Sequence, residues 1–286
     1  MSDLTPSTFN LGLIGYPISN SVSPQIHSTA LKEVGLDGEY KLYPIEPDDK
    51  QGLVDLLTKV RIAEIHGLNV TIPHKQNVML LLDELTPTAE AIGAVNTIAF
   101  KDDKLVGDNT DANGFWNDLQ ILVHGRHGKA RKLKALILGA GGSARAVTYA
   151  LLKHGWDVAI STRRIEQAEE LAQQFPTPNS QLTAISYDAP TLHSLLPTFH
   201  LIVNTTPVGM TSHPQGSPWI EGLPFPPKAA LYDLIYNPTE TQLMKDAVQA
   251  GLPVRNGLGM LIGQALLSFE IWTGHKVPAD KIDLNL

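Results

Sequence analysis

The stretch ALILGAGGSARAVTYALLKHGWDVAIS, residues 135–161, decides the fold of this chain. Residues 135–138 predict a strand without polar alternation, as expected when both of its faces are buried in a parallel sheet. A glycine-rich turn follows, then a helix over about 143–154 and a second strand over 158–160. The order strand, helix, strand predicts a βαβ unit.

The turn GAGGSA, residues 139–144, fits the pattern G-x-G-x-x-G/A. The pattern alone is weak, because glycine-rich turns also serve packing, but here it ends a buried strand and opens a helix. Gly139 allows the tight turn, Gly141 lets a pyrophosphate approach the backbone, and Ala144 packs helix on strand. The free N–H groups of the helix start favour phosphate. The turn therefore predicts a dinucleotide site.

The residues after the second strand predict which dinucleotide binds. An NAD site usually has Asp or Glu here for the ribose 2′-hydroxyl, whereas this chain has STRR at 161–164. Guanidinium groups suit a 2′-phosphate, which a carboxylate would repel. The pattern favours NADP(H), with two solvated arginines at a helix start as the alternative. The missing acid also disfavours an S-adenosylmethionine methyltransferase.

Length and composition limit the other possibilities. A chain of 286 residues suggests two domains, at roughly 100–200 residues each. The net charge of −7 offers no attraction to nucleic acid or anionic lipid, so neither is expected as a partner. Because there is no cysteine, disulfides, iron–sulfur clusters and cysteine nucleophiles are excluded. No metal-binding motif is present, and the start lacks a secretion signal, so we expect a cytoplasmic protein without a metal.

Strands and helices also alternate on either side of the central βαβ unit. The downstream series predicts a doubly wound parallel sheet with right-handed crossovers. In the first third, Ser23 and Pro24 open a predicted helix, with Ser23 as its N-cap and Pro24 as its first residue. A long apolar helix over 258–272 is expected to be largely buried.

Polar residues gather in the first third where predicted strands and helices begin or end. Lys75 follows one strand, Asn96 begins another and Asp111 follows a third, while Ser21 and Ser23 precede a helix. Ligands of open α/β sheets bind beyond the carboxyl ends of the strands, so these loops are candidates for one site. Each residue also has an ordinary alternative, as a helix cap, a turn amide or a surface cation.

Eight ordered motifs, taken together, resemble the shikimate dehydrogenases from Ile14 to Gly274. Besides the glycine turn, they are SVSPQIH (21–27), NVTIPHK (69–75), GAVNT (93–97), GDNTD (107–111), NTTPVGM (204–210), DLIYNPT (233–239) and NGLGML (256–261). The resemblance implies NADPH-dependent reduction of 3-dehydroshikimate to shikimate in aromatic amino-acid (chorismate) biosynthesis. It also implies a substrate domain over 1–112 and 257–286, with a Rossmann-like NADP domain over 113–256 between its two parts.

The resemblance assigns roles to individual residues. Lys75 and Asp111 are implied as the acid–base pair. The implied substrate ligands are Ser21 and Ser23 for the carboxylate, then Thr71, Asn96, Asp111, Tyr236 and Gln264. The implied cofactor ligands are Gly139, Ala140, Gly141, Gly142, Ser143, Thr162, Arg163, Arg164, Leu234 and Gly257.

Two departures from the family pattern leave alternatives open. Ser28 follows His27 where the family often has Asn, and the cofactor loop reads Thr162-Arg163-Arg164 where Asn-Arg-Thr is usual. The arginine pair also resembles quinate/shikimate dehydrogenases, so quinate oxidation with NAD or NADP is the alternative activity. A non-catalytic nucleotide-binding regulator is disfavoured because Lys75 and Asp111 are both present. The expected oligomeric state is a monomer or homodimer.

Overall fold

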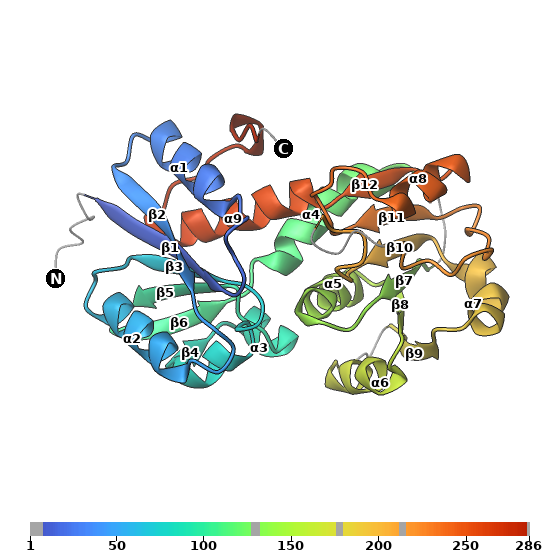
Figure 1. Cartoon of the computed structure of the whole chain (residues 1–286), viewed down its shortest axis with the longest axis horizontal. Coiled ribbons are helices and arrows are strands. Elements are labelled where there is room, and N and C mark those ends of the chain that lie inside the picture. Colours follow the sequence, from blue (N-terminus) through green and yellow to red (C-terminus); the bar gives the residue numbers. More distant parts are fainter. Residues whose placement is uncertain (1–7, 127–131, 176–179, 212–215, 285–286) are drawn as a thin grey trace. The chain divides into compact units, whose positions relative to one another are not determined.

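The computed structural model describes residues 8–126, 132–175, 180–211 and 216–284. These residues form two compact units, each a sheet with surrounding helices (Figure 1). The N-terminal unit holds the chain up to Thr110 and again from Ile262 onward, and the central unit is Asp111–Leu261. The second boundary falls inside helix α9 (Leu258–Thr273), so this helix contributes to both units.

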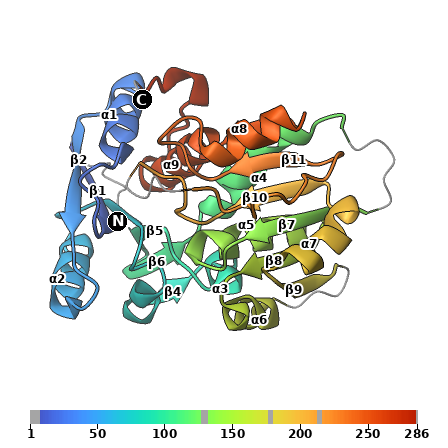
Figure 2. The same ribbon diagram turned by 45° about the vertical axis from the view of Figure 1, so that its right-hand side comes forward.

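The central unit contains six parallel strands in the order β12-β11-β10-β7-β8-β9. Strands β11, β10, β7, β8 and β9 follow one another in this order in Figure 2. The order runs outward from β7 in both directions, which confirms the predicted doubly wound sheet. Its elements are α4 (Asp111–Val123), β7 (Lys134–Leu138), α5 (Gly142–Lys153), β8 (Asp157–Thr162), α6 (Ile165–Gln174), β9 (Leu182–Ser186), α7 (Ala189–Leu195), the short 3₁₀ helix η2 (Leu196–Thr198), β10 (Leu201–Asn204), β11 (Ala230–Asp233), α8 (Gln242–Gln249) and β12 (Val254–Asn256).

The core of the central unit forms on β7, β10 and β11, whose apolar residues are buried on both faces. The proline-rich segment 216–228 has neither helix nor strand. Trp219 and Leu223 of this segment nevertheless join the core. The indole N–H of Trp219 donates to the Leu223 carbonyl at 2.8 Å, so the buried donor is satisfied.

The N-terminal unit has a mixed sheet in the order β2-β1-β3-β5-β6-β4. Strand β5 runs antiparallel to both neighbours, and the other pairs are parallel. Its elements are β1 (Phe9–Gly15), α1 (Ser23–Glu33), β2 (Gly38–Pro44), α2 (Lys50–Arg61), β3 (Gly67–Val70), the 3₁₀ helix η1 (Asn77–Leu81), β4 (Glu84–Leu85), α3 (Pro87–Ile92), β5 (Thr97–Lys101), β6 (Lys104–Asp108) and the 3₁₀ helix η3 (Ala279–Lys281), besides its part of α9.

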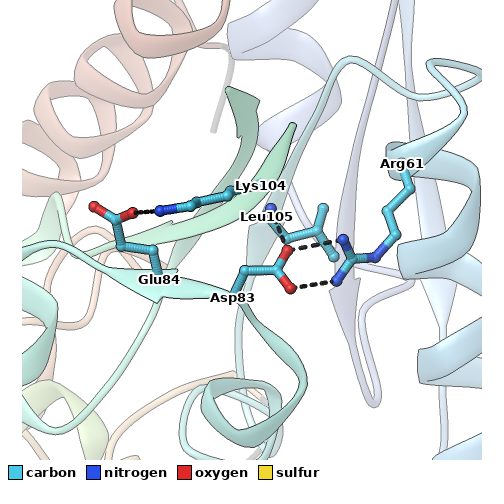
Figure 3. Close-up of polar contacts among 5 residues, drawn as sticks. All are labelled: Arg61, Asp83, Glu84, Lys104 and Leu105. Carbon is cyan, nitrogen blue, oxygen red and sulfur yellow. Dashed lines mark hydrogen bonds and ion pairs between the residues drawn. The ribbon is translucent and has the colours of Figure 1, made fainter. Parts of the chain in front are cut away.

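Ion pairs hold the short edge strand β4 in place (Figure 3). The guanidinium of Arg61, at the end of α2, binds Asp83 with its two Nη atoms, each at 2.8 Å from a carboxylate oxygen. Asp83 also accepts the backbone N–H of Leu105 at 2.7 Å, and Lys104 pairs with Glu84 at 3.0 Å. Strand β4 has only two residues and few backbone hydrogen bonds of its own, and these side-chain contacts connect it to β6 and α2.

The structure corrects the predicted start of the first helix. Val22, not Ser23, is the N-cap of α1, and the Val22 side chain makes no capping hydrogen bond. Ser23 is already helical, and its hydroxyl accepts a hydrogen bond from Ser21 instead of capping the helix. At the C-terminal end, Gly35 has the left-handed φ of +70° that ends the helix.

Besides short 3₁₀ helices, two strands and two α-helices of the structure were not predicted: β4, β12, α3 and α4. The two strands have two and three residues, too few to show an alternating pattern. Helix α4 carries Asn113, Gly114 and Asn117, which are weak helix formers, so tertiary packing of its apolar face stabilises it instead.

Candidate active site

A buried cluster of amides and hydroxyls lies in the N-terminal unit, centred on Asn69 of β3. The Asn69 Nδ2 donates to the Asn96 carbonyl at 3.1 Å and to Ser268 Oγ of α9 at 2.9 Å. Its Oδ1 accepts the Tyr40 hydroxyl at 2.8 Å and lies 3.1 Å from His27 Nε2. One amide thereby ties β3 to α1, β2 and α9. We call these residues the Asn69 cluster.

Asn96, a predicted ligand, belongs to the same cluster and is 2% exposed. Its Nδ2 donates to Thr110 Oγ1 at 2.9 Å and to Gln264 Oε1 at 3.1 Å. Its Oδ1 accepts the Thr110 N–H at 2.8 Å and the Thr97 hydroxyl at 2.9 Å. The structure therefore brings together two of the predicted ligands, Asn96 and Gln264, which lie 168 residues apart in the chain.

Ser21 and Ser23 meet each other at the N-terminal end of α1. The Ser21 hydroxyl donates to Ser23 Oγ at 3.1 Å, and the Ser23 N–H donates back to Ser21 Oγ at 3.3 Å. Ser23 is 8% exposed and Ser21 is half-buried. Burial raises the pKa of Tyr40, and the nearby Ser23 hydroxyl lowers it by less. The serine pair therefore lies near Tyr40 of the Asn69 cluster.

Thr71 and Lys75 follow β3 on one loop. The Thr71 N–H donates to the Ile14 carbonyl at 2.8 Å, and the carbonyl of Lys75 accepts the Val95 N–H at 2.8 Å. Between them, His74 is fully buried, and its Nε2 lies 2.7 Å from the Ile45 carbonyl. These contacts fix the loop backbone, and the Lys75 side chain is half-buried.

Asp111 is 5% exposed and is the first residue of α4. Its neighbour Thr110 is fixed by Asn96, and the Thr110 hydroxyl also donates to the Gln264 carbonyl at 3.0 Å. Lys75 belongs to the N-terminal unit and Asp111 begins the central unit, so the predicted pairing of the two remains a prediction.

The glycine turn of the central unit lies between β7 and α5. Gly139 has φ of +102°, and a Cβ there would lie 2.7 Å from Thr205 Oγ1, so only glycine fits. Gly141 is the N-cap of α5, which begins at Gly142 without a side-chain cap. A Cβ on Gly141 would meet nothing within 4 Å, so space lies open beside the first turn of α5. Ala144 is fully buried, as its predicted packing role requires.

The predicted phosphate-binding residues follow β8. Thr162 ends the strand and is half-buried, and Arg163 and Arg164 are exposed before α6 begins at Ile165. Arg163 also lies close enough to lower the pKa of Tyr187, although burial raises it by more. The two guanidinium groups therefore stand in solvent at the carboxyl end of the strand next to β7, where a 2′-phosphate would need them.

A buried carboxyl group fixes the loop that holds Leu234 and Tyr236. Asp233 has no exposed surface; its Oδ1 accepts Asn204 Nδ2 at 2.9 Å, and its Oδ2 accepts the Thr241 hydroxyl at 2.7 Å. Burial raises the pKa of Asp233, against the effect of these hydrogen bonds. Tyr236 is half-buried, and burial raises its pKa as well.

Gly257 approaches the same loop closely. A Cβ on Gly257 would lie 2.0 Å from the Leu234 carbonyl oxygen, and the Gly257 N–H donates to the Ile235 carbonyl at 3.1 Å. The structure thus places Leu234 and Gly257, two predicted cofactor ligands from separate motifs, in direct contact.

Sequence reasoning did not single out several residues of the Asn69 cluster. They are His27, Tyr40, Asn69, Thr97, Thr110 and Ser268. The motifs contain His27, Asn69, Thr97 and Thr110, so proximity to a predicted ligand was the available signal. Tyr40 and Ser268 lie outside every motif, and only the packing of β2 and α9 brings them in.

The described residues hold no group of three His, Asp or Glu side chains that could bind a metal ion. Among the helices that the structure describes, none is long and apolar enough to cross a membrane.

Family models match three parts of the chain. Residues 13–98 match the shikimate dehydrogenase substrate binding domain, residues 122–208 match shikimate / quinate 5-dehydrogenase, and residues 257–283 match the shikimate 5'-dehydrogenase C-terminal domain. Two similar relatives are named shikimate dehydrogenase (NADP(+)). The protein from Shouchella clausii is 42% identical over 94% of both chains. The protein from Methanopyrus kandleri is 39% identical over 94% of this chain and 92% of its own.

Solved structures share the whole fold. Shikimate 5-dehydrogenase from Thermus thermophilus, in complex with NADP(H) and shikimate, is 35% identical with a TM-score of 0.82, over 96% of this chain and 97% of that one. Quinate dehydrogenase from Corynebacterium glutamicum, in complex with NAD, is 28% identical with a TM-score of 0.85. The match covers 96% of this chain and 97% of that one. The coverage and identity of these relatives confirm the resemblance found in the sequence, and the chain belongs to the shikimate dehydrogenase family.

Proposed function

We propose that this chain is an NADP-dependent shikimate dehydrogenase, which reduces 3-dehydroshikimate to shikimate in aromatic amino-acid biosynthesis. The observation that carries the proposal is the Asn69 cluster with its serine pair. Neutral amides and hydroxyls on rigid elements are suited to a small ligand rich in hydroxyl groups, and neighbouring serine hydroxyls are suited to its carboxylate. Relatives named for this activity align along almost the entire chain.

The central unit fits NADP. The open space beside Gly141 and the uncapped first turn of α5 suit a pyrophosphate, and Arg163 and Arg164 suit a 2′-phosphate. We assign the cofactor to Gly139–Ser143, Thr162–Arg164, Leu234 and Gly257. We likewise assign substrate binding to residues 1–112 and 257–286 and cofactor binding to 113–256. NADPH supplies the hydride of the reduction.

The chain's own residues supply the rest of the chemistry. A carbonyl that receives a hydride becomes an alkoxide, and Lys75 is the residue we assign to give it a proton, with Asp111 as the second member of the acid–base pair. Ser21 and Ser23 hold the carboxylate; Thr71, Asn96, Asp111, Tyr236 and Gln264 orient the ring hydroxyls. Because all four hydrogen-bonding positions of the Asn96 amide are occupied, a substrate hydroxyl there replaces a present partner, Gln264.

Quinate oxidation is the second candidate, since the arginine pair resembles that branch and a quinate dehydrogenase shares the fold. The test is an assay of the purified protein with shikimate or quinate and with NADP or NAD, following nicotinamide absorbance. We expect the highest kcat/KM for shikimate with NADP. A higher kcat/KM for quinate would favour the second candidate, and no turnover with any pair would leave a nucleotide-binding regulator.

The expected location and assembly are also proposals. The acidic, cysteine-free composition favours the cytoplasm, and the expected monomer or homodimer can be tested by light scattering of the purified protein.

A further inference from the structure

Asp233, the last residue of β11, is a buried acid that accepts hydrogen bonds with both of its oxygens. Its Oδ1 accepts the Ile235 N–H at 3.1 Å and Asn204 Nδ2 at 2.9 Å. The Asn204 amide cannot be flipped, because its Oδ1 accepts the Thr206 N–H at 2.9 Å and a backbone N–H can only donate. Asn204 therefore presents its NH₂ group to Asp233, and Oδ1 of Asp233 acts as an acceptor only.

The second oxygen of Asp233 holds the far end of the loop 234–240. The hydroxyl of Thr241, a residue that is 2% exposed, lies 2.7 Å from Asp233 Oδ2. Thr241 is also the N-cap of α8, where its Oγ1 accepts the Met244 N–H at 3.2 Å. Since that bond uses a lone pair, the single proton of the hydroxyl is available for Asp233. One carboxylate thus binds the loop at Ile235, near its start, and at Thr241, just after its end.

Two other side-chain hydrogen bonds to this loop lie near solvent. Thr211 Oγ1 donates to Asn237 Oδ1 at 2.9 Å, and Asn256 Nδ2 donates to the Thr239 carbonyl at 3.0 Å, both at exposed positions. Water competes for exposed hydrogen bonds, whereas Asp233 has no exposed surface. The buried carboxylate is therefore the anchor of the loop that water weakens least.

We propose that Asp233 is a positioning residue for the substrate, because it sets the backbone from which Tyr236 binds the ring hydroxyls. The inference rests on the proposed function, in which Tyr236 binds shikimate. Tyr236 is half-buried and follows Ile235, whose N–H Asp233 binds. Leu234 has an anchor apart from the carboxylate, since its N–H donates to the Asn204 carbonyl at 3.0 Å. Asp233 should therefore affect substrate binding more than cofactor binding.

The first test is Asp233→Asn, which keeps the size of the side chain and turns one acceptor into a donor that faces a donor. We expect the KM of shikimate to rise about 3- to 10-fold, the factor of one lost hydrogen bond, with the KM of NADP within about 2-fold. Asp188→Asn is the matched control, since Asp188 accepts a backbone N–H at the start of α7 in the same unit, and it should change neither constant. An unchanged KM of shikimate in Asp233→Asn, or a larger rise in the KM of NADP, would overturn the proposal.

A double-mutant cycle separates positioning from a general loss of structure. The Tyr236→Phe variant lacks the hydroxyl that we infer Asp233 to position. In that background, Asp233→Asn should raise the KM of shikimate less than about 2-fold, because the two side chains act on one contact. The same factor in both backgrounds would mean that Asp233 does not act through Tyr236, and would reject the inference.

Thr241 keeps the proposal testable if Asp233→Asn does not fold. Thr241→Val loses the proton given to Asp233 and should raise the KM of shikimate about 3- to 10-fold, whereas Thr241→Ser keeps the hydroxyl and should stay within about 2-fold of wild type. A wild-type KM in Thr241→Val, or equal impairment of the two variants, would reject the inference while wild-type turnover of shikimate upholds the proposed function. Absence of turnover in the wild type would reject the function itself.

Discussion

At the residue scale, the proposed activity depends on Lys75. The loop that carries it is fixed by two backbone hydrogen bonds, one from the Thr71 N–H to the Ile14 carbonyl and one from the Val95 N–H to the Lys75 carbonyl. Its side chain is therefore a defined but half-buried cation rather than part of the core. This residue was identified from a motif, and the structure supplies the rigid backbone beneath it.

Lys75→Ala should lower kcat for shikimate oxidation by about 10²- to 10⁴-fold, the usual contribution of a general acid–base. The dissociation constant of NADPH should stay within about 2-fold, because Lys75 lies outside the central unit. Stopped-flow or steady-state turnover, together with a fluorescence titration of NADPH, measures both. Near-wild-type turnover would remove Lys75 from the mechanism.

Arg163 tests the assignment of the 2′-phosphate. The residue is exposed and follows β8, so its removal should leave the fold intact. Arg163→Ala should raise the KM of NADP about 10-fold or more, because a charge-assisted hydrogen bond is lost, and should change the KM of NAD about 2-fold at most. Lys153→Ala, which removes an exposed cation at the other end of α5, is the control. Equal changes for both cofactors would argue against 2′-phosphate recognition.

At the element scale, the turn between β7 and α5 contains one glycine that the backbone conformation requires and another that leaves room for a ligand. Gly139 has a positive φ and no room for a Cβ, whereas Gly141 has an ordinary φ and open space around it. The two glycines of one fingerprint therefore have different physical roles, one for the backbone and one for the ligand.

Gly141→Ala should leave the free energy of unfolding within about 0.5 kcal/mol of wild type while raising the KM of NADP about 10-fold or more. The methyl group would fill the space we assign to the pyrophosphate. Gly139→Ala should instead destabilise the protein by about 1–3 kcal/mol, through backbone strain and the contact with Thr205. Urea denaturation measures the free energy of unfolding of the two variants, and steady-state kinetics measures their KM of NADP. An unchanged KM in Gly141→Ala would place the pyrophosphate elsewhere.

The elements that the sequence predicted well are those with long apolar patterns. Strands β7, β10 and β11 of the doubly wound sheet are buried on both faces, so their apolar runs are plain in the sequence. Strands β4 and β12 depend on pairing with neighbours and have no pattern of their own. The predicted start of α1 was wrong because a serine before a proline is usually a cap, whereas here the Ser23 hydroxyl is hydrogen-bonded to Ser21.

At the scale of the whole molecule, a buried uncharged histidine should make stability depend on pH. The pKa of His27 is about 3 in the folded protein and near 6.5 when unfolded. Below pH 6.5 the unfolded chain binds a proton that the folded protein does not, so stability falls as the pH falls. The loss from this group is about 2–3 kcal/mol between pH 6.5 and 4.5.

The His27→Gln variant isolates this effect, because an amide N–H can still donate to Asn69 but has no proton to gain. Chemical denaturation at pH 7.5, 6.5, 5.5 and 4.5 should show the wild type losing about 2–3 kcal/mol more than the variant over the acidic part of the range. Parallel stability curves for the two proteins would show that His27 does not control this dependence.

The sequence by itself determined the doubly wound sheet, the glycine turn, the arginine pair and the family. All of these depend on residues close together in the chain: apolar runs, a fingerprint of six residues and short motifs. Only the tertiary structure decided which hydroxyl and amide groups are hydrogen-bonded to one another. Asn69 meets Ser268, 199 residues away, and Tyr40 lies outside every motif. Hydrogen-bond direction follows from the whole set of partners around each buried group, and those partners come together only when β2, β3 and α9 pack.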